Sequence, residues 1–174
     1  MYAIELAHAA IDAGADIYYG HGWNKTMGFE IYKGKPIFYG LGNFIAQDQF
    51  VEQLPSDSYE TYHRGNDALI MSDPSMEPKH LKKPGVSWWT SVLAQVKFNR
   101  EKQVKSIIFY PVELGVDLEQ EDAPVNRFIG KQCEGRPFLA SGKGAERILS
   151  AFAGLAKQYG NEVRIENGLA YWEA

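Results

Sequence analysis

The stretch Gly14–Ile45 constrains the fold of this chain more than any other, because it places glycines between short apolar runs. A helical pattern over residues 3–13 leads into it, and a run over residues 16–20 predicts a short strand. Gly14 lies between the two and can end the helix, since glycine tolerates a positive φ angle. A helix, a glycine turn and a strand form an αβ unit, which favours a layered α/β (α+β) fold over an all-β one.

The same stretch also predicts a β-hairpin. Two runs rich in β-branched and aromatic residues, 29–32 and 36–39, are separated by Lys33, Gly34 and Lys35. Gly34 can take the left-handed conformation that a tight hairpin loop requires. We therefore expect two paired strands directly after the first one.

Apolar periodicity predicts a second hairpin and a second helix further along the chain. Alternating residues predict a strand over 86–98, which turns at residues 99–102 into a strand over 104–110. Helical spacing over 145–159, ended by Gly160, predicts the helix, and Ser141 stands where its cap would be. The remaining expectations are a strand over 67–73, loops over 46–66 and 74–84, and a ribbon formed by 163–165 and 169–171.

These elements predict a single partial domain over residues 1–174, since no linker long enough to separate two domains is present. Core strands and hairpins are expected over residues 1–115 and an extended connection over 116–144. The terminal helix and the small ribbon occupy residues 145–174. With 45% apolar residues, such a chain can bury a core.

Charge and composition exclude several classes of function. The net charge of −4, with lysines and arginines scattered along the chain, offers no basic surface for nucleic acid. No apolar run approaches the roughly 20 residues that cross a bilayer, and no signal peptide precedes the first helical pattern. We expect the chain as written to be soluble without a membrane segment. Its one cysteine, Cys133, leaves the compartment unknown.

The chain has four histidines, which are His8, His21, His63 and His80. His8 lies on the apolar side of the predicted helix, where a half-buried, hydrogen-bonded role is the default. His63 and His80 lie in polar segments and are expected at the surface. His21 differs because it follows a predicted strand and is flanked by glycines, and loops after strands of α/β layers assemble sites. The residues alone leave a functional His21 and a structural turn histidine both open.

One imidazole does not make a metal centre, since catalytic zinc takes three protein ligands. The oxygen donors near His21 in the sequence are Asp16, Asn24, Glu30, Asn43 and Asp48. Asp16 is interpreted as a turn residue, Glu30 as a solvent-facing hairpin residue and Asn43 as a turn residue that tolerates positive φ. No nucleophile motif is present, and the run Ser141–Gly144 lacks the spacing of a phosphate-binding loop.

The pattern of the opening stretch resembles the CapA family of bacterial capsule-synthesis (poly-γ-glutamate biosynthesis) proteins, whose domain has a metallophosphatase-like, calcineurin-like fold. Later segments, such as Trp89–Val92 and Tyr110–Gly115, also look like part of this family. The resemblance implies the C-terminal half of an αββα sandwich with a mixed sheet and added hairpins. The matching positions are Gly14–Asp16, Gly20–His21, Phe29–Glu30, Tyr32, Gly34, Pro36–Ile37, Tyr39 and Leu41–Phe44.

The resemblance also implies a divalent-metal site, with Mn, Zn or Fe as the metal. His21 would be a catalytic residue and metal ligand, with Gly20, Gly22, Glu30 and Asn43 as its supporting loop. The second histidine of the family's motif is replaced by Asn24 in this chain, and an amide oxygen is a weaker donor that suits harder ions. The family's N-terminal half, which normally supplies most of the metal ligands, is missing from this sequence.

These implications predict a fragment of a metal-dependent phosphoesterase-like hydrolase that is inactive alone. The alternatives are a non-catalytic accessory or binding module in capsule or polyglutamate synthesis or export, and a truncated gene product. The partners expected on these hypotheses are a missing N-terminal half, a second copy of the chain, an anionic polymer, or a phosphoester substrate. Full-length members of the family are often associated with the cell envelope.

Overall fold

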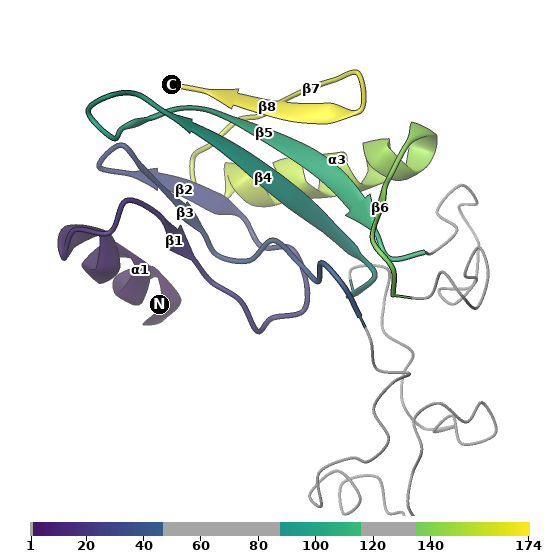
Figure 1. The fold of residues 1–174 in the computed structure, drawn as a ribbon, viewed down its shortest axis with the longest axis horizontal. Helices are drawn as coiled ribbons and strands as arrows, with labels where there is room; N and C mark the ends of the chain where they lie inside the picture. Colours follow the sequence, from purple (N-terminus) through teal and green to yellow (C-terminus); the bar gives the residue numbers. More distant parts are fainter. Residues whose placement is uncertain (1, 47–87, 116–134) are drawn as a thin grey trace, which may run out of the picture. The chain divides into compact units, whose positions relative to one another are not determined.

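A computed structural model describes residues 2–46, 88–115 and 135–174 of the chain (Figure 1). Tertiary contacts divide the chain into a unit of residues 1–45 and 84–174 and a unit of residues 46–83. The first unit is described below. The strand expected over 67–73, the loop over 74–84, His63, His80, Asp48 and most of the connection over 116–144 lie outside the described residues. The single partial domain stays a prediction.

The first layer consists of a helix and a small mixed sheet. The sheet has the order β1-β3-β2, with β1 parallel to β3 and β2 antiparallel to it. Ala7 and Ile11 of the helix are buried together with Ile37 and Tyr39, which fixes the helix on this sheet. The elements are α1 (Tyr2–Asp12), β1 (Tyr18–Tyr19), β2 (Phe29–Tyr32) and β3 (Lys35–Phe38).

The predicted αβ unit and first hairpin are thereby confirmed. Gly14 follows α1 with a φ angle of +105°, as its role at the helix end requires. The hairpin loop has two residues, Lys33 and Gly34, because Lys35 already belongs to β3. Both loop residues have positive φ angles, of 51° and 75°, which is the requirement of a type I′ turn.

The second layer is an antiparallel sheet in the order β4-β5-β8-β7, with β6 paired to β5 beyond this path. The predicted second hairpin and terminal ribbon are confirmed as β4–β5 and β7–β8. The sequence did not indicate that β8 pairs with β5 and so joins the ribbon to the larger sheet. The strands are β4 (Thr90–Phe98), β5 (Val104–Glu113), β6 (Phe138–Leu139), β7 (Arg164–Glu166) and β8 (Leu169–Glu173).

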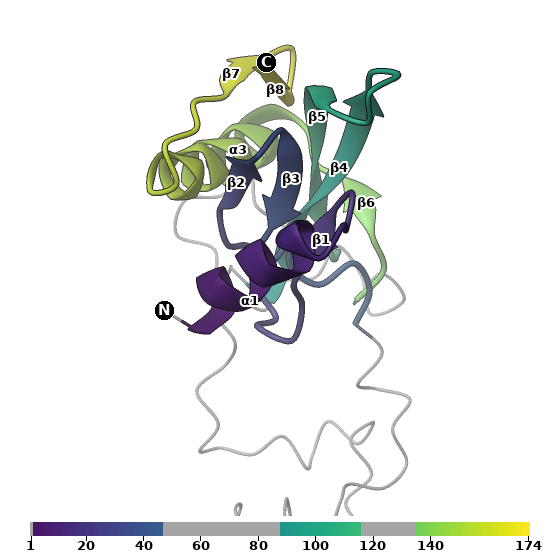
Figure 2. The ribbon, with the colours of Figure 1, turned by 90° about the vertical axis from the view of Figure 1, so that its left-hand side faces the viewer.

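The helix predicted over residues 145–159 is α3, which spans Gly142–Lys157 and so begins three residues before its predicted start. Ser141 stands at the cap position, but its side chain makes no cap hydrogen bond. Gly160, with a φ angle of +75°, follows the helix as expected. The helix packs against β5, β2, β4 and β8 (Figures 1 and 2).

Aromatic side chains from both sheets and α3 meet in the core. The ring of Phe29 lies 5.0 Å from that of Phe109 and 6.0 Å from that of Phe152, measured between centroids. Phe38 also contacts Phe29 and Phe109. Aromatic pairs at such distances add roughly 0.5–1.5 kcal/mol each beyond the area they bury. The mixed α+β class is therefore confirmed, and the metallophosphatase-like assignment stays a prediction.

Neither α1 nor α3 has the length and apolar character needed to span a membrane, and the described residues contain no other candidate helix.

Candidate functional site

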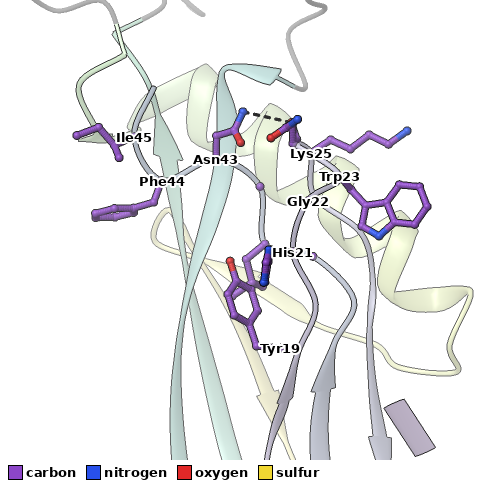
Figure 3. A pocket seen from close by; sticks show the side chains of 12 residues that line it. Tyr19, His21, Gly22, Trp23, Lys25, Asn43, Phe44 and Ile45 are labelled. Atoms are coloured by element: carbon purple, nitrogen blue, oxygen red, sulfur yellow. Dashed lines mark hydrogen bonds between the residues drawn. The ribbon is translucent and has the colours of Figure 1, made fainter. Parts of the chain in front are cut away.

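The carboxyl ends of β1 and β3 form one edge of the small sheet. The strands are parallel and in register, with Tyr18 opposite Ile37 and Tyr19 opposite Phe38, so the loops that follow them leave the sheet side by side. Such edges are where α/β sheets bind ligands. The two loops, residues 20–25 and 40–45, line a cavity of about 320 Å³ together with Tyr19 (Figure 3).

Gly20 lets the first loop leave β1 close to the neighbouring strand. Its N–H donates to the carbonyl oxygen of Phe38 at 2.7 Å. A Cβ atom at this position would lie 2.8 Å from the carbonyl oxygen of Tyr39, closer than real Cβ contacts come. The glycine that precedes His21 is thus a steric requirement of the strand exit.

Gly42 has the same function in the second loop. Its φ angle is +88°, and an added Cβ would lie 2.7 Å from the Cβ of Ser91 and 2.8 Å from the carbonyl oxygen of Thr90. The preceding Leu41 accepts a hydrogen bond from the N–H of Val92 at 2.9 Å. The second loop therefore rests directly on the first residues of β4.

Asn43 connects the two loops and the start of β4. Its side-chain amide donates to the carbonyl oxygen of Trp88 at 3.1 Å and to that of Asn24 at 3.4 Å, and Figure 3 shows the second of these bonds. The interpretation of Asn43 as a positive-φ turn residue is wrong, because Asn43 does not have a positive φ angle. The asparagine of the cavity that does is Asn24, with a φ angle of 53°. The supporting role of Asn43 in a site stays a prediction, and these two bonds show what holds its side chain in place.

His21 lies within the cavity at the end of β1. Its side chain is exposed, and its ring lies 6.3 Å from the ring of Tyr19. Trp23 and Phe44 are exposed on either side, and Figure 3 shows both rings turned outward from His21. Among the described residues of the lining, Lys25 is the other basic one, and none is Asp or Glu.

The structure brings together most of the residues singled out in the sequence. His21, Gly22, Asn24 and Asn43 all line the cavity, and Gly20 positions its first loop. The lining residues that were not predicted as site residues from the sequence are Tyr19, Trp23, Lys25, Gly40, Leu41, Gly42, Phe44 and Ile45. Their position directly beside the Gly-His-Gly and Gly-Asn segments was the signal that could have identified them.

Glu30 belongs to a different cluster. Its carboxylate oxygens each lie 3.0 Å from Nε2 of His8, and one of them accepts a 2.7 Å hydrogen bond from the hydroxyl of Tyr39. The interpretation of Glu30 as solvent-facing is therefore wrong, since its side chain is only 21% exposed. The half-buried, hydrogen-bonded role predicted for His8 is confirmed. Burial, followed by the bond to Glu30, raises the pKa of Tyr39.

Asp16 precedes β1 and therefore lies at the opposite end of that strand from the His21 loop. Its carboxylate accepts hydrogen bonds from the Nζ atoms of Lys35, at 2.7 Å, and of Lys102, at 3.3 Å. The bond from Lys35 is the main cause that lowers the pKa of Asp16. Asp16 therefore ties the two hairpins together and does not contribute to the cavity.

The donor set of the cavity does not fit a complete divalent-metal centre. The lining offers one imidazole, from His21, and the amide groups of Asn24 and Asn43. The amide nitrogen of Asn43 already donates to two carbonyls, and catalytic zinc needs three protein ligands. Across residues 2–46, 88–115 and 135–174, no three His, Cys, Asp or Glu side chains come together in a way that could hold a metal.

Comparison with known proteins agrees with the resemblance of the opening stretch. Residues 1–48 match the family model of the bacterial capsule synthesis protein PGA_cap. The PGA biosynthesis protein CapA of Bacillus subtilis (strain 168) is 51% identical over 59 residues, which is 34% of this chain and 15% of that protein. The capsule biosynthesis protein CapA of Bacillus anthracis is 38% identical over 66 residues, or 38% of this chain and 16% of that protein. The chain is thus similar to CapA proteins over part of its length, and the match to the family model covers residues 1–48.

Similarity to uncharacterized proteins of Sinorhizobium fredii extends over nearly the whole chain. The uncharacterized protein y4sH of Sinorhizobium fredii (strain NBRC 101917 / NGR234) is 31% identical over 172 residues, which covers 93% of this chain and 34% of that protein. The chain thus spans about a third of the length of this relative and a smaller share of the two CapA proteins.

Proposed function

We propose that this chain acts in the synthesis of a bacterial capsule or of poly-γ-glutamate, and that its cavity around His21 is one wall of the ligand site. The observation that carries this proposal is geometric. Two segments within the residues that match the capsule-synthesis family model, around His21 and Asn43, line one cavity at the carboxyl edge of parallel strands. That edge is where ligand sites of α/β sheets are found.

The cavity binds an anionic group in this proposal. The described part of its lining has no carboxylate to repel an anion, and it includes the basic residues His21 and Lys25. Gly22 and Asn24 have positive φ angles, of 95° and 53°. Successive N–H groups in such loops can form a concave anion site. A phosphoester or the carboxylates of an anionic polymer are the ligands of this chemistry.

Metal-dependent hydrolysis needs donors beyond those described for this chain, so the chain alone is inactive in this proposal. The test is turnover of p-nitrophenyl phosphate and bis(p-nitrophenyl) phosphate by the purified chain with Mn²⁺ or Zn²⁺. We expect no turnover above that of the metal in buffer. Turnover that is lost in His21→Ala and kept in His8→Gln, a histidine change outside the cavity, would contradict this part of the proposal.

A non-catalytic binding module is the second candidate, and the lack of Asp and Glu among the described lining residues favours it. The two candidates differ in what restores activity. Addition of the separately produced N-terminal portion of a CapA protein should give His21-dependent hydrolysis if the chain is part of an enzyme site. A binding module would retain its anion affinity and remain inactive after that addition.

A further inference from the structure

A second cavity lies beside the first and has the opposite chemistry. It has a volume of about 300 Å³, and its lining includes Phe44, Leu93, Tyr110, Val112, Phe138 and Leu139. These residues come from β4, β5 and β6 and from the loop after β3. Three of them are unusually open to solvent, with 58% of Phe44, 42% of Leu93 and 64% of Leu139 exposed. We call this cavity the apolar cleft.

The apolar cleft offers little to a polar ligand. The hydroxyl of Tyr110 already donates to Oε1 of Gln95 at 2.9 Å. A polar group placed against these side chains would lose part of its hydration and find few hydrogen-bond partners to replace it. A hydrocarbon gains there instead, because it removes its own surface and that of the exposed side chains from water.

Phe44 connects the apolar cleft to the His21 cavity, because it lines both. Its ring points away from His21 in Figure 3. A ligand that follows this connection passes from a polar end with His21 and Asn43 to an apolar end. Among the residues that the structure describes, no Asp or Glu lines the cleft to repel an anionic ligand.

We propose that the apolar cleft binds the hydrocarbon chain of an anionic amphiphile whose phosphate or carboxylate head lies in the His21 cavity. This inference rests on the proposed function of that cavity and names its ligand class. The cleft has room for about ten groups of the size of a water molecule or a methylene. A protein partner fits less well, because stable protein interfaces use about 20–30 residues a side and seven of the described residues line the cleft.

The test is the affinity of the full chain for n-alkyl phosphates of increasing length, from ethyl to octyl, measured by calorimetry below their micelle concentrations. A fully buried methylene adds about 0.8 kcal/mol, which is about fourfold in affinity. The cleft is partly open, so we expect two- to fourfold tighter binding for about each added methylene. Equal affinities for ethyl and octyl phosphate would overturn the inference and leave the His21 cavity untouched.

Variants separate the two ends of the ligand. Leu93→Thr and Leu139→Thr should flatten the dependence on chain length and leave ethyl phosphate binding unchanged. Ile165→Thr is the matched control, because Ile165 is 39% exposed on β7 and does not line the cleft. His21→Ala should weaken binding of every chain length by the same factor. If His21→Ala has no effect while chain length still matters, the head group lies elsewhere and the inference is overturned.

Sedimentation velocity tests the competing occupant, which is a second copy of the chain. We expect the same monomeric species for the wild-type chain and for Leu139→Thr. A dimer that dissociates in Leu139→Thr would show that another copy covers the cleft, and would overturn the proposal of an amphiphile.

Discussion

Asn43 gives the sharpest test of how the His21 cavity is organised. Its side-chain amide makes two hydrogen bonds to carbonyl oxygens, at 3.1 Å to Trp88 and at 3.4 Å to Asn24. A neutral hydrogen bond contributes about 0.5–1.5 kcal/mol net, and the longer bond contributes least. Asn43→Ala should therefore lower the free energy of unfolding by roughly 1–2 kcal/mol. For a chain of this size the midpoint of thermal unfolding should fall by about 2–8 °C.

Asn43→Asp should be worse than alanine at neutral pH. An ionised carboxylate accepts only, so it would face two carbonyl oxygens without a proton to share. Below the pKa of the new carboxyl group, protonation restores one donor, and part of the lost stability should return. Thermal unfolding of both variants at pH 7 and pH 4 measures this difference.

Asn161 provides a matched control. Its amide also donates to two carbonyl oxygens, those of Phe29 and Tyr159, both at 3.1 Å, and the residue is buried away from the cavity. Asn161→Ala should destabilise the chain to a similar or greater degree and leave the imidazole NMR signal of His21 unchanged. Asn43→Ala should shift that signal. Equal effects of the two variants on the His21 signal would refute the role given to Asn43.

Three further predictions concern the loops and the polar clusters. Gly20→Ala should lower the free energy of unfolding by about 1–3 kcal/mol, because the added methyl group would clash with the neighbouring strand. Gly154→Ala, in α3 with open space around it, should raise the free energy of unfolding by about 0.5–1 kcal/mol. Denaturant unfolding measures both changes. The pKa of Tyr39 is raised in the folded chain, so its contribution to the free energy of unfolding should be complete below the pKa of an unfolded tyrosine and fall as the pH rises above that value. Tyr39→Phe should remove this loss of stability at alkaline pH. The pKa of Asp16 is lowered, so its contribution to the free energy of unfolding should be complete above the pKa of an unfolded aspartate and disappear as the pH falls through the pKa of the folded chain. Asp16→Asn should flatten the dependence of stability on pH in this acid range.

The sequence predicted the elements well where the signal was local. The loop at Lys33 and Gly34 needs positive φ at both residues, and glycine after a β-rich run indicates such a turn. Asn167–Gly168 at the β7–β8 turn carries the same signal, with φ angles of 51° and 74°. The strand and helix periods followed from residues that are close in sequence.

What the sequence did not predict depends on contacts between distant residues. Glu30 sits on a hairpin strand where alternation suggests exposure, yet His8, 22 residues earlier, covers it. The pairing of β8 with β5 and the bond of Asn43 to Trp88, 45 residues away, are also set by tertiary structure. Local patterns carry no information about such pairs, so the family resemblance identified the His21 segment before its surroundings could be derived.

The central claim is that the His21 cavity is the ligand site of this chain. The most direct measurement is the imidazole NMR spectrum of the full chain during titration with phenyl phosphate at constant pH, with signals assigned through single histidine variants. We predict a saturable shift of the His21 signal, while the signal of His8, held by Glu30, stays in place. A shift of the His8 signal with an unchanged His21 signal, or no shift at all at millimolar ligand, would contradict the account.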